Sequence, residues 1–212
     1  MSEGPTYTPE QREVLAQAEE ALAVQLAEKP RRLEHSLSVA RTAESLALAY
    51  GVDPFAARLA GTLHDWCKAL PNSEQERLCV ERGVCFDVDL SLVTPLLHGP
   101  LAASLLPERF PWMTPEVCQA IERHTIGAPD MTPLDMVVFI ADYVEPLRPD
   151  TPAIAHSRSI VGSATLLELC LDVAIGSISF VLETERYLYP ATIDTYNALV
   201  LTRAKKTGDT WE

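Results

Sequence analysis

The residues of this sequence most able to do chemistry are an adjacent histidine and aspartate, His64 and Asp65, at the end of an apolar segment rich in small residues. His35 lies upstream and Asp142 downstream, each inside another segment with helical periodicity. Imidazole and carboxylate groups are ligands for hard and borderline divalent metals. A metal ion held by such groups lowers the pKa of a bound water until hydroxide is available near neutral pH. The four residues therefore indicate a metal-dependent hydrolase.

Two further histidines lie beside glycines at predicted helix ends. His98 precedes Gly99 directly and His124 precedes Gly127 by three residues, and a glycine lets the backbone or a ligand approach closely. Together with the four residues above, these histidines could form a two-metal site in which Asp65 is shared. The first ion would be held by His35, His64, Asp65 and Asp142, and the second by Asp65, His98 and His124. Two nearby metals suit phosphate chemistry, because they stabilise both the attacking and the leaving oxygen of an in-line displacement.

Each of these residues also has a purely structural interpretation. His35 would be a hydrogen-bonded core histidine, and Asp142 would form an ion pair with Arg148 or Arg123. The adjacent histidine and aspartate would be a chance pair at a helix terminus. The metal site is favoured because ionisable groups on apolar helix faces are costly unless they are paired or bind a metal.

The elements that must position these residues are predicted to be helices. Threonine or aspartate N-caps precede prolines at five places, from Thr8-Pro9 to Thr151-Pro152, and period-two alternation is nearly absent. We therefore predict an all-α fold. The expected helices cover residues 8–28, 31–50, 54–67, 73–82, 89–94, 99–106, 114–125, 132–146, 160–185 and 190–206. The fifth histidine, His156, falls in a stretch interpreted as a solvated Pro/Ser-rich loop.

One structural domain is expected from 212 residues, of which 47% are hydrophobic. Within it we expect an N-terminal packing helix over 1–30, a catalytic core over 31–150 and C-terminal helices over 151–212 that cover the core. The net charge of −13 argues against nucleic-acid and anionic-membrane partners. Five cysteines without a C-x-x-C motif, no signal peptide and no long apolar run predict a soluble, cytoplasmic protein.

The pattern His35…His64-Asp65…Asp142 resembles the signature of the HD-domain phosphohydrolases. More narrowly, the chain resembles the YqeK family, bacterial HD-domain enzymes that cleave diadenosine tetraphosphate symmetrically into two ADP. Pro100 and Ile126 depart from the usual family pattern, but neither removes a candidate ligand. The stretches that carry the resemblance are Arg32–His35, Ala60–Lys68, Leu96–Gly99, Ala120–Gly127, Met131–Asp135, Ile140–Arg148 and Thr192–Asn197.

This resemblance implies an HD-domain helical bundle with a C-terminal helical cover and a dinuclear metal centre, usually iron. Manganese, cobalt and zinc remain alternatives, because sites of histidine and carboxylate ligands admit all of them. The implied metal ligands are His35, His64, Asp65, His98, His124 and Asp142. The substrate would be a dinucleoside polyphosphate, attacked at an inner phosphorus by a metal-bound hydroxide. A homodimer and a monomer both remain open for the assembly.

We assign His64, Asp65 and Lys68 to the catalytic centre, because a lysine four residues after His64 projects over the same site. Candidate substrate-binding residues are Arg32, Lys68, Thr125 and Arg148. For Arg32 and Arg148 a surface ion pair is an equal alternative, and Arg148 could instead hold Glu145. Asp135 is interpreted as a structural or outer carboxylate.

Two other functions compete with symmetrical hydrolysis. A mononuclear HD enzyme would act on nucleoside or deoxynucleoside monophosphates. A regulatory domain would bind nucleotides without cleaving them, but such degenerate domains typically lack a metal ligand, whereas this sequence retains the full set.

Overall fold

The structure is a computed structural model that describes residues 4–208. Over this range it contains ten α-helices and three short 3₁₀ segments, and no strand, so the predicted all-α class is confirmed. The first five helices are α1 (Pro9–Gln25), α2 (Pro30–Tyr50), α3 (Pro54–Leu63), α4 (Asn72–Arg82) and α5 (His98–Arg109). The others are α6 (Pro115–Arg123), α7 (Pro133–Val144), α8 (Pro152–Ile160), α9 (Leu166–Glu183) and α10 (Pro190–Thr207). The 3₁₀ segments are η1 (Trp66–Ala69), η2 (Leu90–Leu92) and η3 (Thr94–Leu96).

Helices begin at all five cap-proline pairs, four of them where a helix was expected and the fifth, at Thr151-Pro152, where the list of expected helices had none. In each case the N-cap side chain accepts a hydrogen bond from a backbone N–H of the first turn, which would otherwise have no partner. Proline then occupies the first helical position, where its missing N–H costs nothing. The capping residues are Thr8, Asp53, Thr114, Thr132 and Thr151.

The C-terminal region differs from the sequence-based expectation. The stretch interpreted as a loop before a single helix over 160–185 forms α8, a turn and then α9. Thr151 caps α8, and Ile154 and Ser157 are buried. His156 therefore lies on a helix, although its side chain is 62% exposed as expected for a solvated group. The prediction failed because α8 is short and packs on the core with only two large apolar side chains, Ile154, which is buried, and Ile160, which is partly buried.

Two other boundaries are corrected. The helix expected over 54–67 ends at Leu63, and the chain turns through His64 and Asp65 into η1. The helix expected over 89–94 is instead the pair of 3₁₀ segments η2 and η3. The first change shortens the helix but leaves the adjacent histidine and aspartate at its end, where the sequence placed them.

The close approach of α2 and α3 depends on a glycine. A Cβ on Gly61 would lie 2.9 Å from the Cα of Ala40, closer than real Cβ atoms come, so any larger residue would push the helices apart. The small residues of this segment therefore let α2 and α3 approach closely. The contact brings the end of α3 beside the first turns of α2, where His35 lies.

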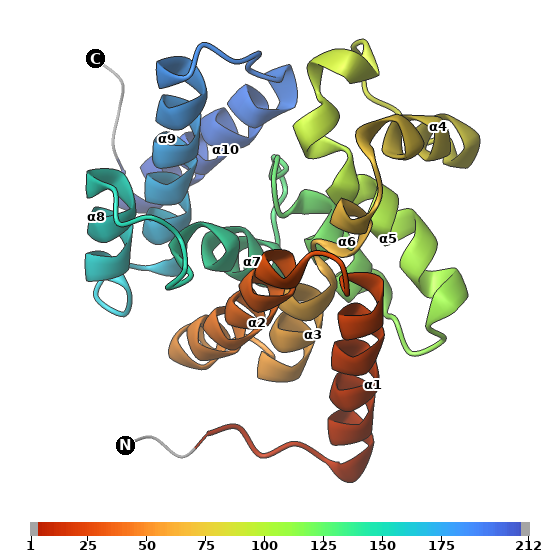
Figure 1. Ribbon diagram of the computed structural model, residues 1–212. Helices are drawn as coiled ribbons and strands as arrows, with labels where there is room; N and C mark the ends of the chain where they lie inside the picture. Colours follow the sequence, from red (N-terminus) through yellow and green to blue (C-terminus); the bar gives the residue numbers. More distant parts are fainter. Residues whose placement is uncertain (1–3, 209–212) are drawn as a thin grey trace.

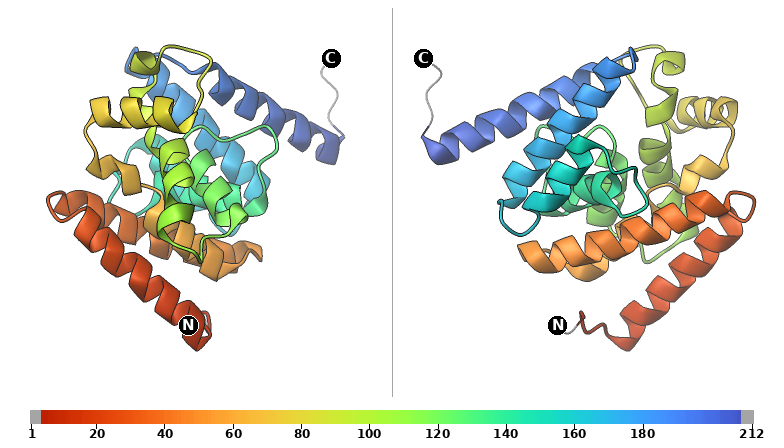
Figure 2. Two further views of the ribbon diagram at one scale, coloured as in Figure 1. Left: turned by 90° about the vertical axis from the view of Figure 1, so that its right-hand side faces the viewer. Right: turned by 60° about the vertical axis from the view of Figure 1, so that its left-hand side comes forward.

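Two hydrophobic clusters make up the core. One is formed mainly by α1, α3, α5 and α6, and the other mainly by α2, α7, α9 and the middle of α10. Figure 1 shows α8 to α10 gathered on one side of α7, with α4 and α5 on the other side. Figure 2 shows α1 and α10 on opposite sides of the molecule. The helices that carry the candidate site belong to both clusters, so the site lies where the clusters meet. No helix in the described part of the chain is both long enough and apolar enough to span a membrane.

Candidate metal centre

The structure brings the six predicted donors into one cluster, each from a helix or a helix end. Five of them are buried, and Asp142 is half-buried at the rim. Their positions are His35 on α2, His64 and Asp65 after α3, His98 at the start of α5, His124 after α6 and Asp142 near the end of α7. These residues are scattered over more than a hundred positions in the sequence, so their meeting is a result of helix packing rather than of local structure.

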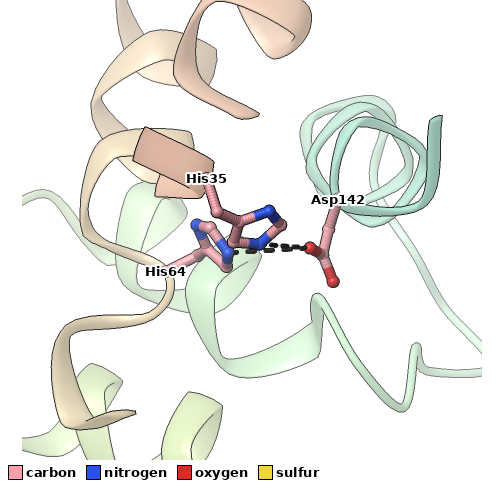
Figure 3. Close-up of side chains that lie close together, drawn as sticks. All are labelled: His35, His64 and Asp142. Carbon is pink, nitrogen blue, oxygen red and sulfur yellow. Dashed lines mark ion pairs between the residues drawn. The ribbon is translucent and has the colours of Figure 1, made fainter. Parts of the chain in front are cut away.

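One part of the cluster consists of His35, His64 and Asp142, shown in Figure 3. The Oδ1 atom of Asp142 lies 3.0 Å from His35 Nε2 and 3.7 Å from His64 Nε2. Potential ligand atoms of the three residues all lie within 4.8 Å of one another. Two imidazole nitrogens and a carboxylate oxygen at such distances could hold one divalent ion.

Asp65 connects this group to the remaining histidines. Its Oδ1 lies 3.2 Å from His98 Nε2 and 3.7 Å from His64 Nε2, whereas its Oδ2 lies 3.8 Å from His35 Nε2. Asp65 also forms a second group of potential ligands with His64 and His124. One carboxylate thus faces both halves of the cluster, which is the arrangement that a shared ligand between two ions requires.

Hydrogen bonds on the outer side of the rings orient three of the histidines. His64 Nδ1 lies 2.7 Å from the carbonyl oxygen of Gly61, and His124 Nδ1 lies 2.6 Å from that of Ile121. A carbonyl oxygen only accepts, so each Nδ1 must carry the proton and each Nε2 presents a lone pair. His35 is oriented in the same way by a carboxylate, Glu145, at 3.0 Å.

The inward-facing nitrogens lack the partners that buried polar atoms normally have. Among the described residues, the Nε2 atoms of His35 and His64 make no hydrogen bond, although carboxylates lie nearby. The Nε2 atoms of His98 and His124 are 3.0 Å apart, so at most one of them carries the proton. Unpaired buried groups are costly, and a metal ion would satisfy the converging lone pairs of these imidazole nitrogens and carboxylate oxygens. The residues therefore fit a metal centre.

The electrostatic environment favours the protonation states that metal binding needs. Burial lowers the pKa of His64 and His98, and burial together with the other two histidines lowers the pKa of His124 to about 3. Burial acts to raise the pKa of Asp65, but His64 and His98 outweigh it and hold the pKa well below its usual range. Neutral imidazoles and ionised carboxylates are the forms that bind metals.

His35 and Asp142 behave as a pair. Burial disfavours the charged form of both, but their mutual attraction, with Arg148 acting on Asp142, outweighs it. The pKa of Asp142 is therefore lowered and the pKa of His35 is raised. Of the four histidines in the cluster, His35 is thus the only one whose pKa is raised, so its surroundings favour the protonated imidazolium when no metal is bound.

Positively charged side chains lie beside the two carboxylates of the cluster, and Lys68 is close enough to Asp65 to be attracted by it. Arg32 Nη1 lies 3.1 Å from Asp65 Oδ2 and its side chain is 47% exposed. Arg148 donates from Nη2 to Asp142 Oδ1 at 2.6 Å and from Nε to the carbonyl oxygen of Asp142 at 2.8 Å. Lys68 donates to the carbonyl oxygen of Pro95 at 3.1 Å. All three predicted cations are therefore at the site, and each retains donors for an anionic ligand.

Thr125 follows His124 and carries a hydroxyl without a partner. Its Oγ1 is buried and makes no hydrogen bond within residues 4–208. The following glycine, Gly127, has a φ of +74°, and a Cβ there would lie 2.4 Å from Thr195 Cγ2 on α10. The turn after α6, which carries Thr125, therefore packs tightly against α10.

The structure decides between several alternatives for the charged residues. Asp142 pairs with Arg148, as one alternative proposed, and not with Arg123. The guanidinium of Arg148 bonds to Asp142, whereas its backbone N–H donates to the carbonyl oxygen of Glu145 at 3.0 Å, so Arg148 contacts both residues. Asp135 has the structural role expected, because it completes the capping box of α7 and pairs with Arg123 at 2.9 Å.

Glu145 supports the site although the sequence alone gave it no role of its own. This residue is buried, ends α7 and bonds to His35 Nδ1. Its position three residues after Asp142 places it near the same helix face, and metal-bound histidines commonly donate to a carboxylate. That spacing is the signal that could have identified it.

The fold and the cluster define the class of protein. The HD-domain family profile matches residues 32–147, a span that contains all six clustered donors. A crystal structure from Clostridium acetobutylicum, described as a predicted HD superfamily hydrolase involved in NAD metabolism, aligns with a TM-score of 0.80. The alignment has 32% sequence identity and covers 88% of this chain and 97% of that chain.

Two curated relatives narrow the class to a family. A protein from Halalkalibacterium halodurans is 34% identical over 170 residues, covering 80% of this chain and 89% of that protein. A protein from Staphylococcus aureus is 32% identical over 168 residues, covering 79% of this chain and 86% of that protein. Both are named symmetrical bis(5′-nucleosyl)-tetraphosphatase. The chain belongs to the YqeK family of HD-domain proteins.

Proposed function

We propose that this protein hydrolyses diadenosine tetraphosphate and related dinucleoside polyphosphates symmetrically, giving two ADP. The observation that carries the proposal is the convergence of four imidazoles and two carboxylates, with Asp65 facing both halves of the cluster. The names of the relatives at 31–34% identity support the same reaction.

The proposed cofactor is a pair of divalent or mixed-valent metal ions, most simply iron, with manganese, cobalt and zinc as alternatives. When bound, such ions would lower the pKa of water and stabilise negative charge on phosphate oxygens. The proposed ligands are His35, His64, Asp65, His98, His124 and Asp142, and the fixed Nδ1 protons of His64 and His124 keep their Nε2 lone pairs available.

The cationic side chains would receive the polyphosphate. The chain as a whole carries a net charge of −13, so an anionic substrate is repelled unless positive groups concentrate at the site. Arg32 and Arg148 can present planar forks to phosphate oxygens, whereas Lys68 acts as a compact charge. Lys68 lies beside Asp65, where burial lowers its pKa against the pull of that carboxylate. The buried hydroxyl of Thr125 would gain a partner by donating to a phosphate oxygen.

Further parts of the proposal concern the whole chain. We propose that residues 31–150 act as the catalytic core, that residues 4–30 pack against it and that residues 151–208 cover it; residues 1–3 and 209–212 of the expected segments lie outside the described residues. A cytoplasmic location agrees with the free cysteines of the described chain. Neither nucleic acid nor a membrane is proposed as a partner. A homodimer is the alternative to a monomer, and sedimentation of the purified protein distinguishes the two.

The test is product analysis. Purified, metal-replete protein is incubated with diadenosine tetraphosphate, and the nucleotides are separated by chromatography. The proposal expects ADP as the sole product, two per substrate consumed. ATP with AMP would indicate asymmetric cleavage, and release of nucleoside and phosphate from deoxynucleoside monophosphates alone would favour a mononuclear enzyme. Binding without any product would indicate a regulatory domain.

A further inference from the structure

Glu145 and Arg158 form a hydrogen-bonded chain that leads from α8 to the metal centre. Glu145 Oε1 lies 3.0 Å from His35 Nδ1, and Arg158 holds the backbone of the turn that carries Glu145. We propose that Glu145 is a positioning residue that fixes the ring orientation and tautomer of His35, and that Arg158 fixes Glu145. This inference rests on the proposed metal centre, since it concerns how one of its ligands is prepared.

The carboxylate of Glu145 is fully committed to acceptor roles. Its Oε1 faces His35 Nδ1, and its Oε2 accepts from the backbone N–H of Leu147 at 2.7 Å. The side chain is only 1% exposed. A buried carboxylate is costly unless hydrogen bonds compensate for its lost hydration, and here each oxygen has a donor. Because Glu145 accepts at Nδ1, the neutral ring keeps its proton there and leaves the Nε2 lone pair free.

Glu145 cannot itself be one of the metal ligands in this arrangement. It approaches the His35 ring at Nδ1, whereas Asp142 and Asp65 lie on the Nε2 side, at 3.0 Å and 3.8 Å. The imidazole therefore stands between Glu145 and the cluster. Its effect on the centre must pass through His35.

Arg158 fixes the turn after α7 through three carbonyl groups. It donates from Nε to Val144 at 2.9 Å and from Nη2 to Glu145 at 2.6 Å and to Arg148 at 3.2 Å. Carbonyls at a helix C-terminus have no partner within the helix, so this guanidinium satisfies groups that would otherwise need water. The turn also carries Arg148, which binds Asp142.

The chain of contacts assigns a task to α8. Arg158 lies outside residues 32–147, the span matched by the HD-domain profile, yet its contacts end at two residues that touch the cluster, Glu145 and Arg148. Its remaining pair, with Asp150 at 3.0 Å, involves a carboxylate that is 76% exposed. That exposed pair contributes little, so the three carbonyl contacts define the role of Arg158.

The decisive variant is Glu145→Gln, which keeps the shape and changes the hydrogen-bonding pattern. A glutamine has one accepting oxygen and one donating nitrogen, so it cannot accept from both His35 and Leu147. If the glutamine oxygen still accepts from Leu147, the glutamine NH₂ group faces His35 Nδ1. The ring proton must then move to Nε2, and the Nε2 lone pair is no longer available to bind a metal. We expect metal-free Glu145→Gln protein to bind Mn²⁺ about 10- to 100-fold more weakly than wild type. Arg158→Lys should weaken binding in the same direction, and Asp150→Asn is the matched control, expected to stay within about twofold.

A second measurement separates positioning from general destabilisation. Nitrogen NMR of the metal-free protein in alkaline buffer, where His35 is neutral, reports which ring nitrogen carries the proton. We expect Nδ1–H in wild type and Nε2–H in Glu145→Gln. Wild-type Mn²⁺ affinity in Glu145→Gln, or a wild-type His35 protonated at Nε2, would overturn the inference. The wild-type spectrum decides even if the variant does not fold. If wild type binds no Mn²⁺, the proposed metal centre fails and the positioning role fails with it.

Discussion

Replacement of Asp65 by asparagine tests whether one carboxylate serves both halves of the cluster. Asp65 is the residue whose two oxygens face different histidines, His98 with Oδ1 and His35 with Oδ2. Asparagine has the same shape, and its side-chain oxygen can still accept a hydrogen bond from His98 Nε2. It removes one negative charge and one ligand oxygen from the cluster, while His35, His64 and Asp142 remain within 4.8 Å of one another. We therefore expect Asp65→Asn to bind one metal ion where wild type binds two.

The size of the effect follows from what the variant loses. Removing a single group that stabilises developing charge on an oxygen typically costs about 10²–10³ in kcat. A divalent ion carries more charge than such a group, so we expect hydrolysis of diadenosine tetraphosphate to fall by at least about 10³-fold. The fold should survive, because removing one partner from a buried hydrogen bond costs about 1–3 kcal/mol. Domains typically have about 5–15 kcal/mol of stability.

The assay pairs elemental analysis with initial rates on the same preparation. The matched control is Asp172→Asn on α9, where a half-buried carboxylate accepts from Ser157 at 2.6 Å and lies 3.5 Å from His156. We expect this control to keep two metal ions and the wild-type rate. Two bound ions and undiminished turnover in Asp65→Asn would refute the idea that Asp65 is a shared ligand.

Three further predictions concern the cation rim, acidity and the metal. Lys68→Gln should lower kcat/KM about 10- to 100-fold, because a hydrogen bond to a charged group contributes about 1.5–3 kcal/mol; a rate equal to that of the exposed control Lys205→Gln would contradict the role. Burial lowers the pKa of His64, His98 and His124, so below pH 6.5, their ordinary pKa, the unfolded metal-free chain binds more protons than the folded one. The free energy of unfolding of the metal-free protein should therefore be highest above that pH and fall on acidification by up to about 1.4 kcal/mol per pH unit for each histidine. Denaturant titrations that show the free energy of unfolding rising below pH 6.5 would contradict this prediction. Chelation of the metal should abolish turnover. Adding Mn²⁺ to the chelated protein at about 100 times its Kd should raise the free energy of unfolding by about 2.7 kcal/mol, or Tm by roughly 5–10 °C. An unchanged Tm would argue against a metal site in the native state.

Much of the helical framework was predictable because its signals are local. A capping side chain, a proline and a following apolar face fix a helix start within a few residues, as at Thr114 and Thr132. Helix α8 lacked such a clear pattern beyond its cap at Thr151. It is nine residues long, and it is held by packing of Ile154 and by Arg158 contacts to a distant turn. Those interactions exist only in the folded chain.

The candidate site was predictable in residue type and less so in its supporting contacts. Histidines and aspartates on apolar helix faces are conspicuous, because such groups are costly unless they have a partner. The partner of His35 Nδ1 is 110 residues away, on α7, and the sequence offers several carboxylates for that place. Choosing Glu145 among them requires the crossing of α2 and α7. The pairing of Arg148 with Asp142 likewise depends on how the chain turns after α7.

An anomalous difference map from crystals loaded with Mn²⁺ tests the central claim most directly. We expect two strong peaks inside the cluster, one beside His35, His64 and Asp142 and the other beside His98 and His124, with Asp65 reaching both. A map with full occupancy of surface sites but no peak among these side chains would contradict it.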